Sequence, residues 1–153
     1  MLITLALGVL IAALLIAFLP KTQLTPSETG NRGMMLDVKE WCDFDIVGEG
    51  SYQDALGKLS RDSDSHVAHL RPEPENQFDK NAVAVYIGYD KVGYLPKDDA
   101  KAYVHELNSA GIRGFMFACP AYISGGFKKD DGARAHFGVK LGIKDPIRIL
   151  PMT

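Results

Sequence analysis

The chain has 153 residues, with 17 Lys and Arg against 19 Asp and Glu and a formal net charge of −2 at pH 7. After an apolar N-terminal run and a polar linker are set aside, about 110 residues remain, enough for one domain with a single core. The charge balance argues against a protein that slides along duplex DNA by long-range attraction, but it leaves open a grip on one strand end through stacking and hydrogen bonds.

The N-terminal run, Leu2 to Leu19, is apolar and uncharged and is ended by Pro20 and Lys21. As a helix with about 1.5 Å rise per residue it would span roughly 27 Å, close to the hydrocarbon thickness of a bilayer. A cleaved signal peptide is the alternative, but the sequence has no basic stretch before the run and no Ala-x-Ala site after it. We therefore expect a single-pass membrane anchor over residues 1–20, followed by a linker over residues 21–42.

Basic residues follow the anchor and none precedes it: the nearest are Lys21, Arg32 and Lys39. This asymmetry predicts that the domain faces the cytoplasm. In that compartment we expect Cys42 and Cys119 to be reduced and packed, although the two could in principle pair.

The rest of the chain predicts a domain over residues 43–145 and a C-terminal tail over residues 146–153. Apolar alternation and turn signals indicate about six strands and two helices, hence a mainly β fold built as a small, partly open OB/SH3-like barrel. The expected strands are Asp43 to Val47, Ser65 to Leu70, Ala82 to Ile87, a short one around Val92 to Leu95, Phe115 to Cys119, Ala121 to Ser124 and His136 to Leu141. The expected helices are Tyr52 to Leu59 and one that starts at Pro96 and stops at Gly111.

The most informative segment is Leu70 to Val85, Leu-Arg-Pro-Glu-Pro-Glu-Asn-Gln-Phe-Asp-Lys-Asn-Ala-Val-Ala-Val, followed by Val-Gly-Tyr-Leu-Pro at residues 92–96. A polar, proline-bearing loop runs into an alternating apolar strand, a turn and a second strand. With the residues around it, over roughly residues 43–143, this segment resembles the HIRAN domain, a small module found on helicase-like DNA repair proteins and alone in bacterial and phage proteins. The resemblance implies a small barrel that binds the 3′ end of single-stranded DNA.

The sequence also departs from the pattern. Gly50 and Ser51 precede Tyr52, where DNA-end-binding members of the family carry Arg and a second aromatic residue. Compensating contacts could come from Arg71, which lies one position nearer Leu70 than in the family pattern, or from Lys128, Lys129 and Arg134. Asp130 and Asp131, however, make that last stretch resemble an ordinary solvated hairpin tip.

Two residues of the polar loop are candidates for direct recognition. The resemblance implies that the Asp79 carboxylate accepts a hydrogen bond from a terminal 3′-hydroxyl and repels a terminal phosphate. The structural alternative, which does not exclude the first, is that Asp79 caps its turn by accepting from backbone N–H groups near Asn81. Asn76 could offer its amide to a base edge or phosphate, or it could make its own turn.

Two aromatic residues could stack on bases. Tyr52 follows a glycine-bearing turn at a helix start, so we expect its ring at the rim of the barrel, available to an unpaired base, with packing in the core as the alternative. For Phe78, beside Asp79, packing in the core is the favoured reading, and walling the same pocket is the alternative.

Two further residues could contact phosphates. Lys97 starts the second predicted helix, where backbone amides and the helix dipole favour an anion. Asp98 and Asp99 fit the alternative of a well-capped helix without a ligand. The Tyr94 hydroxyl could donate one hydrogen bond to a phosphate.

No sequence feature favours an enzyme. The sequence has no Gly-x-x-x-x-Gly-Lys-Ser/Thr loop, and His66 and His69, three apart on a predicted strand, should face opposite sides. We expect no catalysis, cofactor or metal. The partners expected are the 3′ end of single-stranded DNA, the membrane through Leu2 to Leu19, and a protein that supplies helicase or nuclease activity. The competing hypothesis is a module that binds a peptide or protein at the membrane.

Overall fold

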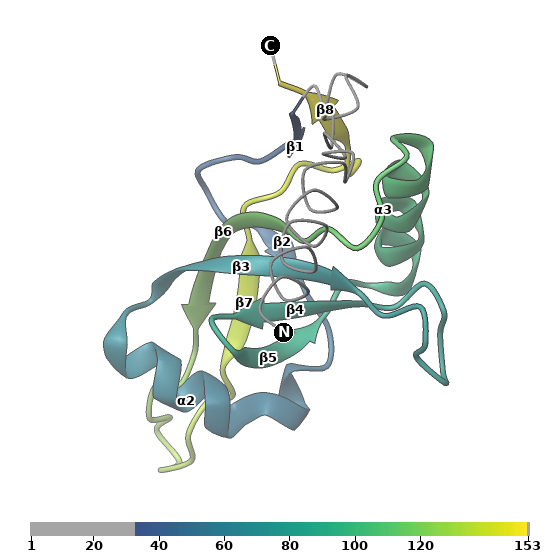
Figure 1. The fold of residues 1–153 in the computed structure, drawn as a ribbon. Coiled ribbons are helices and arrows are strands. Elements are labelled where there is room, and N and C mark those ends of the chain that lie inside the picture. The colour runs from purple at the N-terminus through teal and green to yellow at the C-terminus, as the bar shows by residue number, and fades with distance from the viewer. Residues whose placement is uncertain (1–32, 153) are drawn as a thin grey trace, which may run out of the picture. The chain divides into compact units, whose positions relative to one another are not determined.

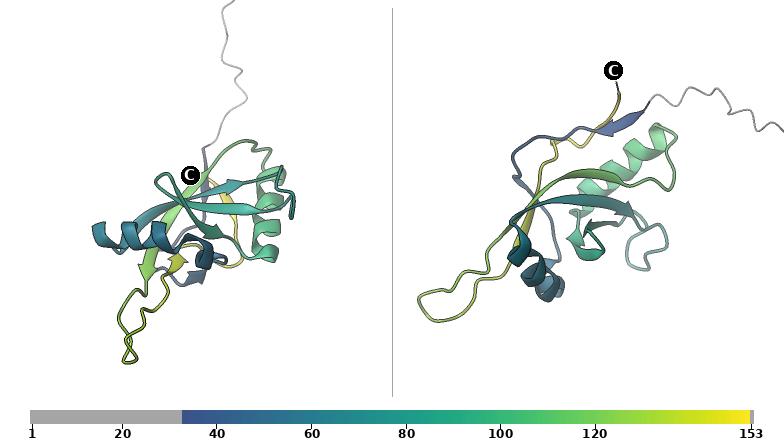
Figure 2. Two further views of the ribbon diagram at one scale, coloured as in Figure 1. Left: turned by 90° about the horizontal axis from the view of Figure 1, so that it is seen from below. Right: turned by 60° about the vertical axis from the view of Figure 1, so that its left-hand side comes forward.

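The computed structural model of the chain describes residues 33–152. The strands are β1 (Met34–Leu36), β2 (Phe44–Asp45), β3 (Ser65–Pro72), β4 (Val83–Ile87), β5 (Asp90–Tyr94), β6 (Phe117–Ser124), β7 (Gly138–Leu141) and β8 (Ile149–Pro151). The helices are a 3₁₀ turn, η1 (Glu49–Tyr52), and two α-helices, α2 (Gln53–Asp62) and α3 (Lys97–Ser109), as Figures 1 and 2 show. The anchor expected at Leu2 to Leu19 lies outside the described residues and stays a prediction. Within residues 33–152, no helix has the length and apolar character needed to cross a membrane.

Six strands form one antiparallel sheet in the order β2-β7-β6-β3-β4-β5, curved into a half-barrel. Alternation along the central strands places one face of the sheet in the core: on β3, Ala68 and Leu70 are buried, and on β6 every second residue from Phe117 to Ile123 is buried. The prediction of a mainly β fold with two helices and about six strands is confirmed.

The two edges of the sheet meet at one point. Val47, just beyond β2, bridges Tyr94 at the end of β5, with the N–H of each donating to the other's carbonyl oxygen at 2.8 Å. Gly93 makes this approach possible, because a Cβ there would lie 2.7 Å from the carbonyl oxygen of Val47 and 2.7 Å from Cδ1 of Ile46. The bridge brings the chain after β2 beside the loop that precedes β4.

A separate two-stranded ribbon joins the two ends of the described chain. β1 pairs antiparallel with β8, from Met34 opposite Pro151 to Leu36 opposite Ile149. Leu36 and Ile149 are both buried and belong to the same hydrophobic core as the sheet. These strands fall in segments that the sequence assigns to the linker and the C-terminal tail, where no strand is predicted.

Both α-helices contribute apolar side chains to this core. α2 buries Leu56, and α3 buries Ala100, Tyr103 and Leu107. The hydroxyl of Tyr103 reaches the carbonyl oxygen of Leu70 at 3.5 Å, so the polar end of this ring is satisfied inside the core. α3 is thereby fixed against the strand that leads into the polar loop (Figure 1).

Several boundaries differ from the expectations. The two strands predicted at Phe115 to Cys119 and Ala121 to Ser124 are one strand, β6, because Pro120 lies within an otherwise regular pairing with β3 and β7.

Cys42 and Cys119 are both free, and burial raises the pKa of the Cys119 thiol to about 12.

Candidate functional site

The loop of residues 73–82, between β3 and β4, is held by its own backbone. The Glu73 N–H donates to the Ala82 carbonyl at 2.8 Å, which closes the base of the loop, and the Ala82 N–H donates to the Asp79 carbonyl at 3.0 Å. Pro72 and Pro74 flank Glu73 and restrict the backbone dihedral angles where the loop leaves the sheet. The loop therefore presents its tip residues in a defined geometry.

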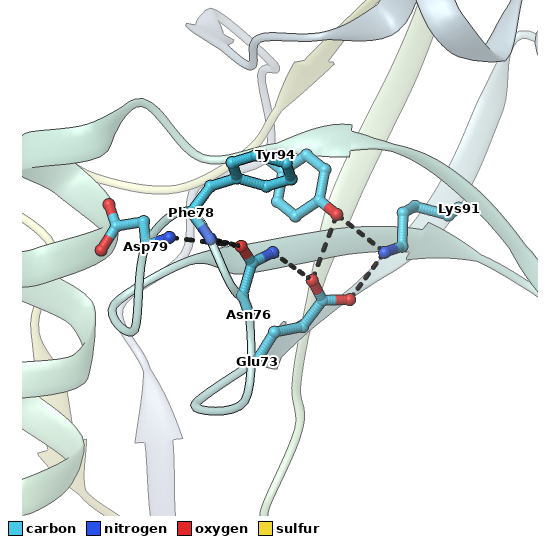
Figure 3. A network of polar contacts seen from close by, with 6 residues as sticks. All are labelled: Glu73, Asn76, Phe78, Asp79, Lys91 and Tyr94. Atoms are coloured by element: carbon cyan, nitrogen blue, oxygen red, sulfur yellow. Dashed lines mark hydrogen bonds and ion pairs between the residues drawn. The ribbon is translucent and has the colours of Figure 1, made fainter.

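Asn76 organises the interior of this loop. Its Oδ1 accepts from the N–H groups of Phe78 (3.0 Å) and Asp79 (3.2 Å), and its Nδ2 donates to Oε2 of Glu73 at 3.1 Å (Figure 3). Both lone pairs of the amide oxygen are thus occupied by the turn. The alternative in which Asn76 makes its own turn is confirmed, which leaves one amide hydrogen for a ligand.

Asp79 uses one carboxylate oxygen for structure. Its Oδ1 accepts from the Asn81 N–H at 2.8 Å, so the predicted turn cap is confirmed. Among the described residues, no hydrogen bond engages Oδ2. The carboxylate points away from that of Glu73 (Figure 3), and Asp79 is half-buried at the rim of the loop.

Phe78 does not pack in the core, and that expectation is wrong: its side chain is 95% exposed. The cause is local, because Asn76 turns the backbone so that residue 78 lies at the tip of the loop, away from the sheet. An aromatic ring this exposed gains almost nothing from folding. It is therefore free to contact a ligand.

An open hollow of about 540 Å³ lies between the tip of the loop, the bridge from Val47 to Tyr94 and the start of α3. Its lining residues are Val47, Asn76, Phe78, Asp79, Ala82, Tyr94, Leu95, Lys97 and Ala100. The loop supplies both apolar and polar members, α3 supplies Lys97 and Ala100, and the chain at the two sheet edges supplies the rest. This size and this mixture are typical of sites for small ligands or single monomers of a polymer.

Five of the seven residues that the sequence indicates as candidates line this hollow: Asn76, Phe78, Asp79, Tyr94 and Lys97. Lys97 is exposed, and no ion pair within residues 33–152 includes it. Tyr52 lies next to the hollow: its pKa is raised, first by burial and then by the neighbouring Tyr94. Arg71 lies elsewhere, exposed over the ring of Tyr86 at 5.9 Å, and lines a separate hollow of about 400 Å³.

The sequence reading missed two residues that hold Tyr94 in place. Nζ of Lys91 donates to Oε1 of Glu73 (2.6 Å) and to the Tyr94 hydroxyl (2.8 Å), and that hydroxyl donates to Oε2 of Glu73 (3.1 Å), as Figure 3 shows. The Tyr94 hydroxyl, which the sequence offered as a donor to a phosphate, therefore donates its hydrogen bond to Glu73. Glu73 and Lys91 are 18 positions apart, so no local spacing reveals the pair.

This network shifts the pKa values of its members. Burial alone would raise the pKa of the Glu73 carboxyl, but hydrogen bonds from Lys91, Asn76 and Tyr94 hold it below its usual value. Burial alone would lower the pKa of Lys91, but the bonds to Glu73 and Tyr94 raise it. A carboxyl with a lowered pKa stabilises the fold at neutral pH, and that contribution is lost as the pH falls through the lowered pKa.

We expect Lys91→Met to lower the free energy of unfolding at pH 7 by about 1–2 kcal/mol, because it leaves a mostly buried carboxylate without its cation. The difference from the unmodified chain should shrink as the pH falls through the lowered pKa of Glu73 and its carboxyl is protonated. Thermal unfolding across pH measures both effects.

Lys144→Met is the matched control for this prediction. Lys144 pairs with Asp37 at 2.9 Å, but its side chain is 54% exposed, and such pairs contribute little. Equal destabilisation by the two substitutions, or a Lys91→Met effect that does not change with pH, would contradict the role given to the network.

Comparison with known proteins gives one family. A family model described as the HIRAN domain matches residues 43–119, just over half of the chain. The match runs from just before β2 into β6 and includes all seven candidate residues. No curated protein and no solved structure matches the chain.

Proposed function

The chain belongs to the HIRAN domain family, whose members are DNA-binding modules, and on this premise we propose that it captures the 3′ end of single-stranded DNA without catalysing a reaction. The observation that carries the proposal is the pairing of Phe78 with Asp79 at the mouth of one hollow. An exposed ring lies beside a carboxylate oxygen that has no partner among the described residues.

The hollow can distinguish a strand that ends in a 3′-hydroxyl from one that ends in a 3′-phosphate. Oδ2 of Asp79 can accept a hydrogen bond from a 3′-hydroxyl, whereas the same negative charge repels a 3′-phosphate. Oδ1 is fixed by Asn81, so Oδ2 points in one direction and needs no reorientation on binding. Asn76 acts here as a positioning residue, because its amide sets the backbone on which Asp79 lies.

The terminal nucleotides have partners around the same hollow. The Phe78 ring offers a stacking face for a base, and Tyr52, beside Tyr94, offers a second. Lys97 lies at the first residue of α3, where its charge adds to the free backbone N–H groups of the helix start, so it is the strongest phosphate contact. We assign Tyr94 to the wall of the hollow and Arg71 to a more distant contact.

A peptide-binding module is the second candidate, favoured by the apolar residues Val47, Ala82, Leu95 and Ala100 in the lining. These residues would also accept a hydrophobic side chain. Attachment to the cytoplasmic face of a membrane, and a protein partner with helicase or nuclease activity, remain further proposals that depend on the sequence of Leu2 to Leu19 and on the family.

Fluorescence anisotropy of the full chain in mild detergent, with labelled strands ending in a 3′-hydroxyl or a 3′-phosphate, tests the proposal. We expect micromolar or tighter binding of the hydroxyl strand and about tenfold weaker binding by Phe78→Ala, since one base loses its stacking partner. Tyr89→Ala, which removes another fully exposed ring outside the hollow, should change nothing. Absence of binding to either strand at low salt would reject DNA capture and favour the peptide-binding candidate.

A further inference from the structure

A second recess, which we call the α2 groove, lies between α2 and the loop that joins β6 to β7. Its volume is about 560 Å³, and it is lined by Gln53, Asp54, Gly57, Lys58, Arg61, Arg134, Ala135, His136 and Phe137. The β6–β7 loop projects from the sheet beside α2 (Figures 1 and 2). None of the residues that line the first hollow is among these.

The two walls of the α2 groove are fastened together. The side-chain amide of Gln53 clamps the backbone of Phe137: its Oε1 accepts from the Phe137 N–H at 2.8 Å, and its Nε2 donates to the Phe137 carbonyl at 3.0 Å. The Phe137 ring also lies against α2, since a Cβ at Gly57 would be in ordinary van der Waals contact with it at 3.4 Å. The shape of the groove is therefore fixed by hydrogen bonds between its two walls.

The α2 groove carries positive charge that the fold does not use. Lys58 and Arg61 are three apart on α2 and so lie on one side of the helix, and Arg134 faces them from the loop. All three are exposed, and none belongs to an ion pair within residues 33–152. Asp54 is the one acidic residue among the lining residues. In a chain with a net charge of −2, this local excess favours an anionic ligand.

Two adjacent residues of the chain lie at the first hollow and at the α2 groove. Tyr52, the last residue of η1, lies beside Tyr94 of the first hollow, and Gln53, the next residue, lines the groove. A strand whose end occupies the hollow can pass over the Tyr52 ring and reach Lys58, Arg61 and Arg134. The groove then meets a segment one or more nucleotides away from the end.

We propose that the α2 groove binds the sugar-phosphate backbone of the same nucleic-acid strand whose 3′ end occupies the first hollow. This inference rests on the proposed function and deepens it: the hollow reads the end, and the groove holds the following phosphates without reading their sequence. Lys58, Arg61 and Arg134 are the phosphate contacts.

Strand length distinguishes the two sites. The full chain is titrated with 3′-hydroxyl strands of about three and about twelve nucleotides, at about 50 mM and about 200 mM salt. We expect the triple variant Lys58→Gln/Arg61→Gln/Arg134→Gln to bind the long strand at least about tenfold more weakly and the short strand as the unmodified chain does. Loss of three phosphate contacts should also make the salt dependence of long-strand binding shallower by about two units of slope.

A matched variant, Lys101→Gln/Arg113→Gln/Arg148→Gln, removes the same charge from exposed positions that line neither recess. It should leave long-strand binding nearly unchanged. If the groove variant binds both strands normally, or if both triple variants weaken long-strand binding equally, the groove inference is overturned while end capture stands. If the unmodified chain binds neither strand, the proposed function fails and the groove inference fails with it.

Discussion

Asp79→Asn is expected to remove most of the preference for a 3′-hydroxyl over a 3′-phosphate. The amide keeps an oxygen for the Asn81 N–H, which Oδ1 accepts at 2.8 Å, so the turn survives. The charge at the mouth of the hollow is lost. A hydrogen bond to a charged acceptor contributes about 1.5–3 kcal/mol, which corresponds to roughly 10- to 150-fold in affinity for the hydroxyl strand.

The same substitution should improve binding of the phosphate strand, because the repulsion from the carboxylate disappears. This opposite response is the signature of a group that reads the strand end directly. Anisotropy titrations with the two strands measure it, and Asp90→Asn, which removes an exposed carboxylate at the first residue of β5, is the control. A parallel fall in both affinities would show instead that Asp79 acts only through the shape of the loop.

Gly93→Ala is expected to destabilise the domain by about 2–4 kcal/mol. The added Cβ would lie 2.7 Å from the Val47 carbonyl oxygen, a backbone atom that cannot turn aside. Relief requires Val47 to separate from Tyr94, which breaks the two hydrogen bonds that join the sheet edges. Burial of an unpaired backbone group adds to the cost.

Thermal and denaturant unfolding of the full chain measure this effect. Gly50→Ala is the control, because a Cβ at Gly50 meets no atom within 4 Å, and it should change stability by less than about 0.5 kcal/mol. Similar stabilities for the two variants would mean that the closure between Val47 and Tyr94 contributes little. Because Val47 and Tyr94 both line the first hollow, Gly93→Ala should also weaken DNA binding.

In the loop of residues 73–82, local sequence rules predicted the turns but not the position of every side chain. The Asx cap at Asp79 and the turn made by Asn76 were both among the alternatives that the sequence offered, because each is a bond between residues two or three apart. For Phe78 the observed place beside the hollow was only the alternative and the core was favoured, because a sequence reading counts an aromatic residue as core unless something turns it outward. The Asn76 side chain provides that turn, and its effect on the neighbouring ring shows only in three dimensions.

The arrangement of charged residues from distant parts of the chain could not be predicted from local rules. Glu73 and Lys91 lie on either side of β4 in the sequence, and their ion pair forms because β4 and β5 fold back beside the loop. The basic side chains of the α2 groove meet in the same way, since Arg134 is far from Lys58 and Arg61 along the chain. Local signals such as residue spacing and capping patterns predict neither arrangement.

The sequence by itself determined the elements whose cause is local: the β4–β5 hairpin, α3 after Pro96, the alternation of β3, and the loop pattern that marks the family. Only the tertiary structure decided where those elements meet: the β1–β8 ribbon, the closure of Val47 onto Tyr94, and the hollow that gathers Phe78, Asp79 and Lys97. The physical reason is that periodicity and turn chemistry act over a few residues, whereas these contacts are set by burial of one shared core.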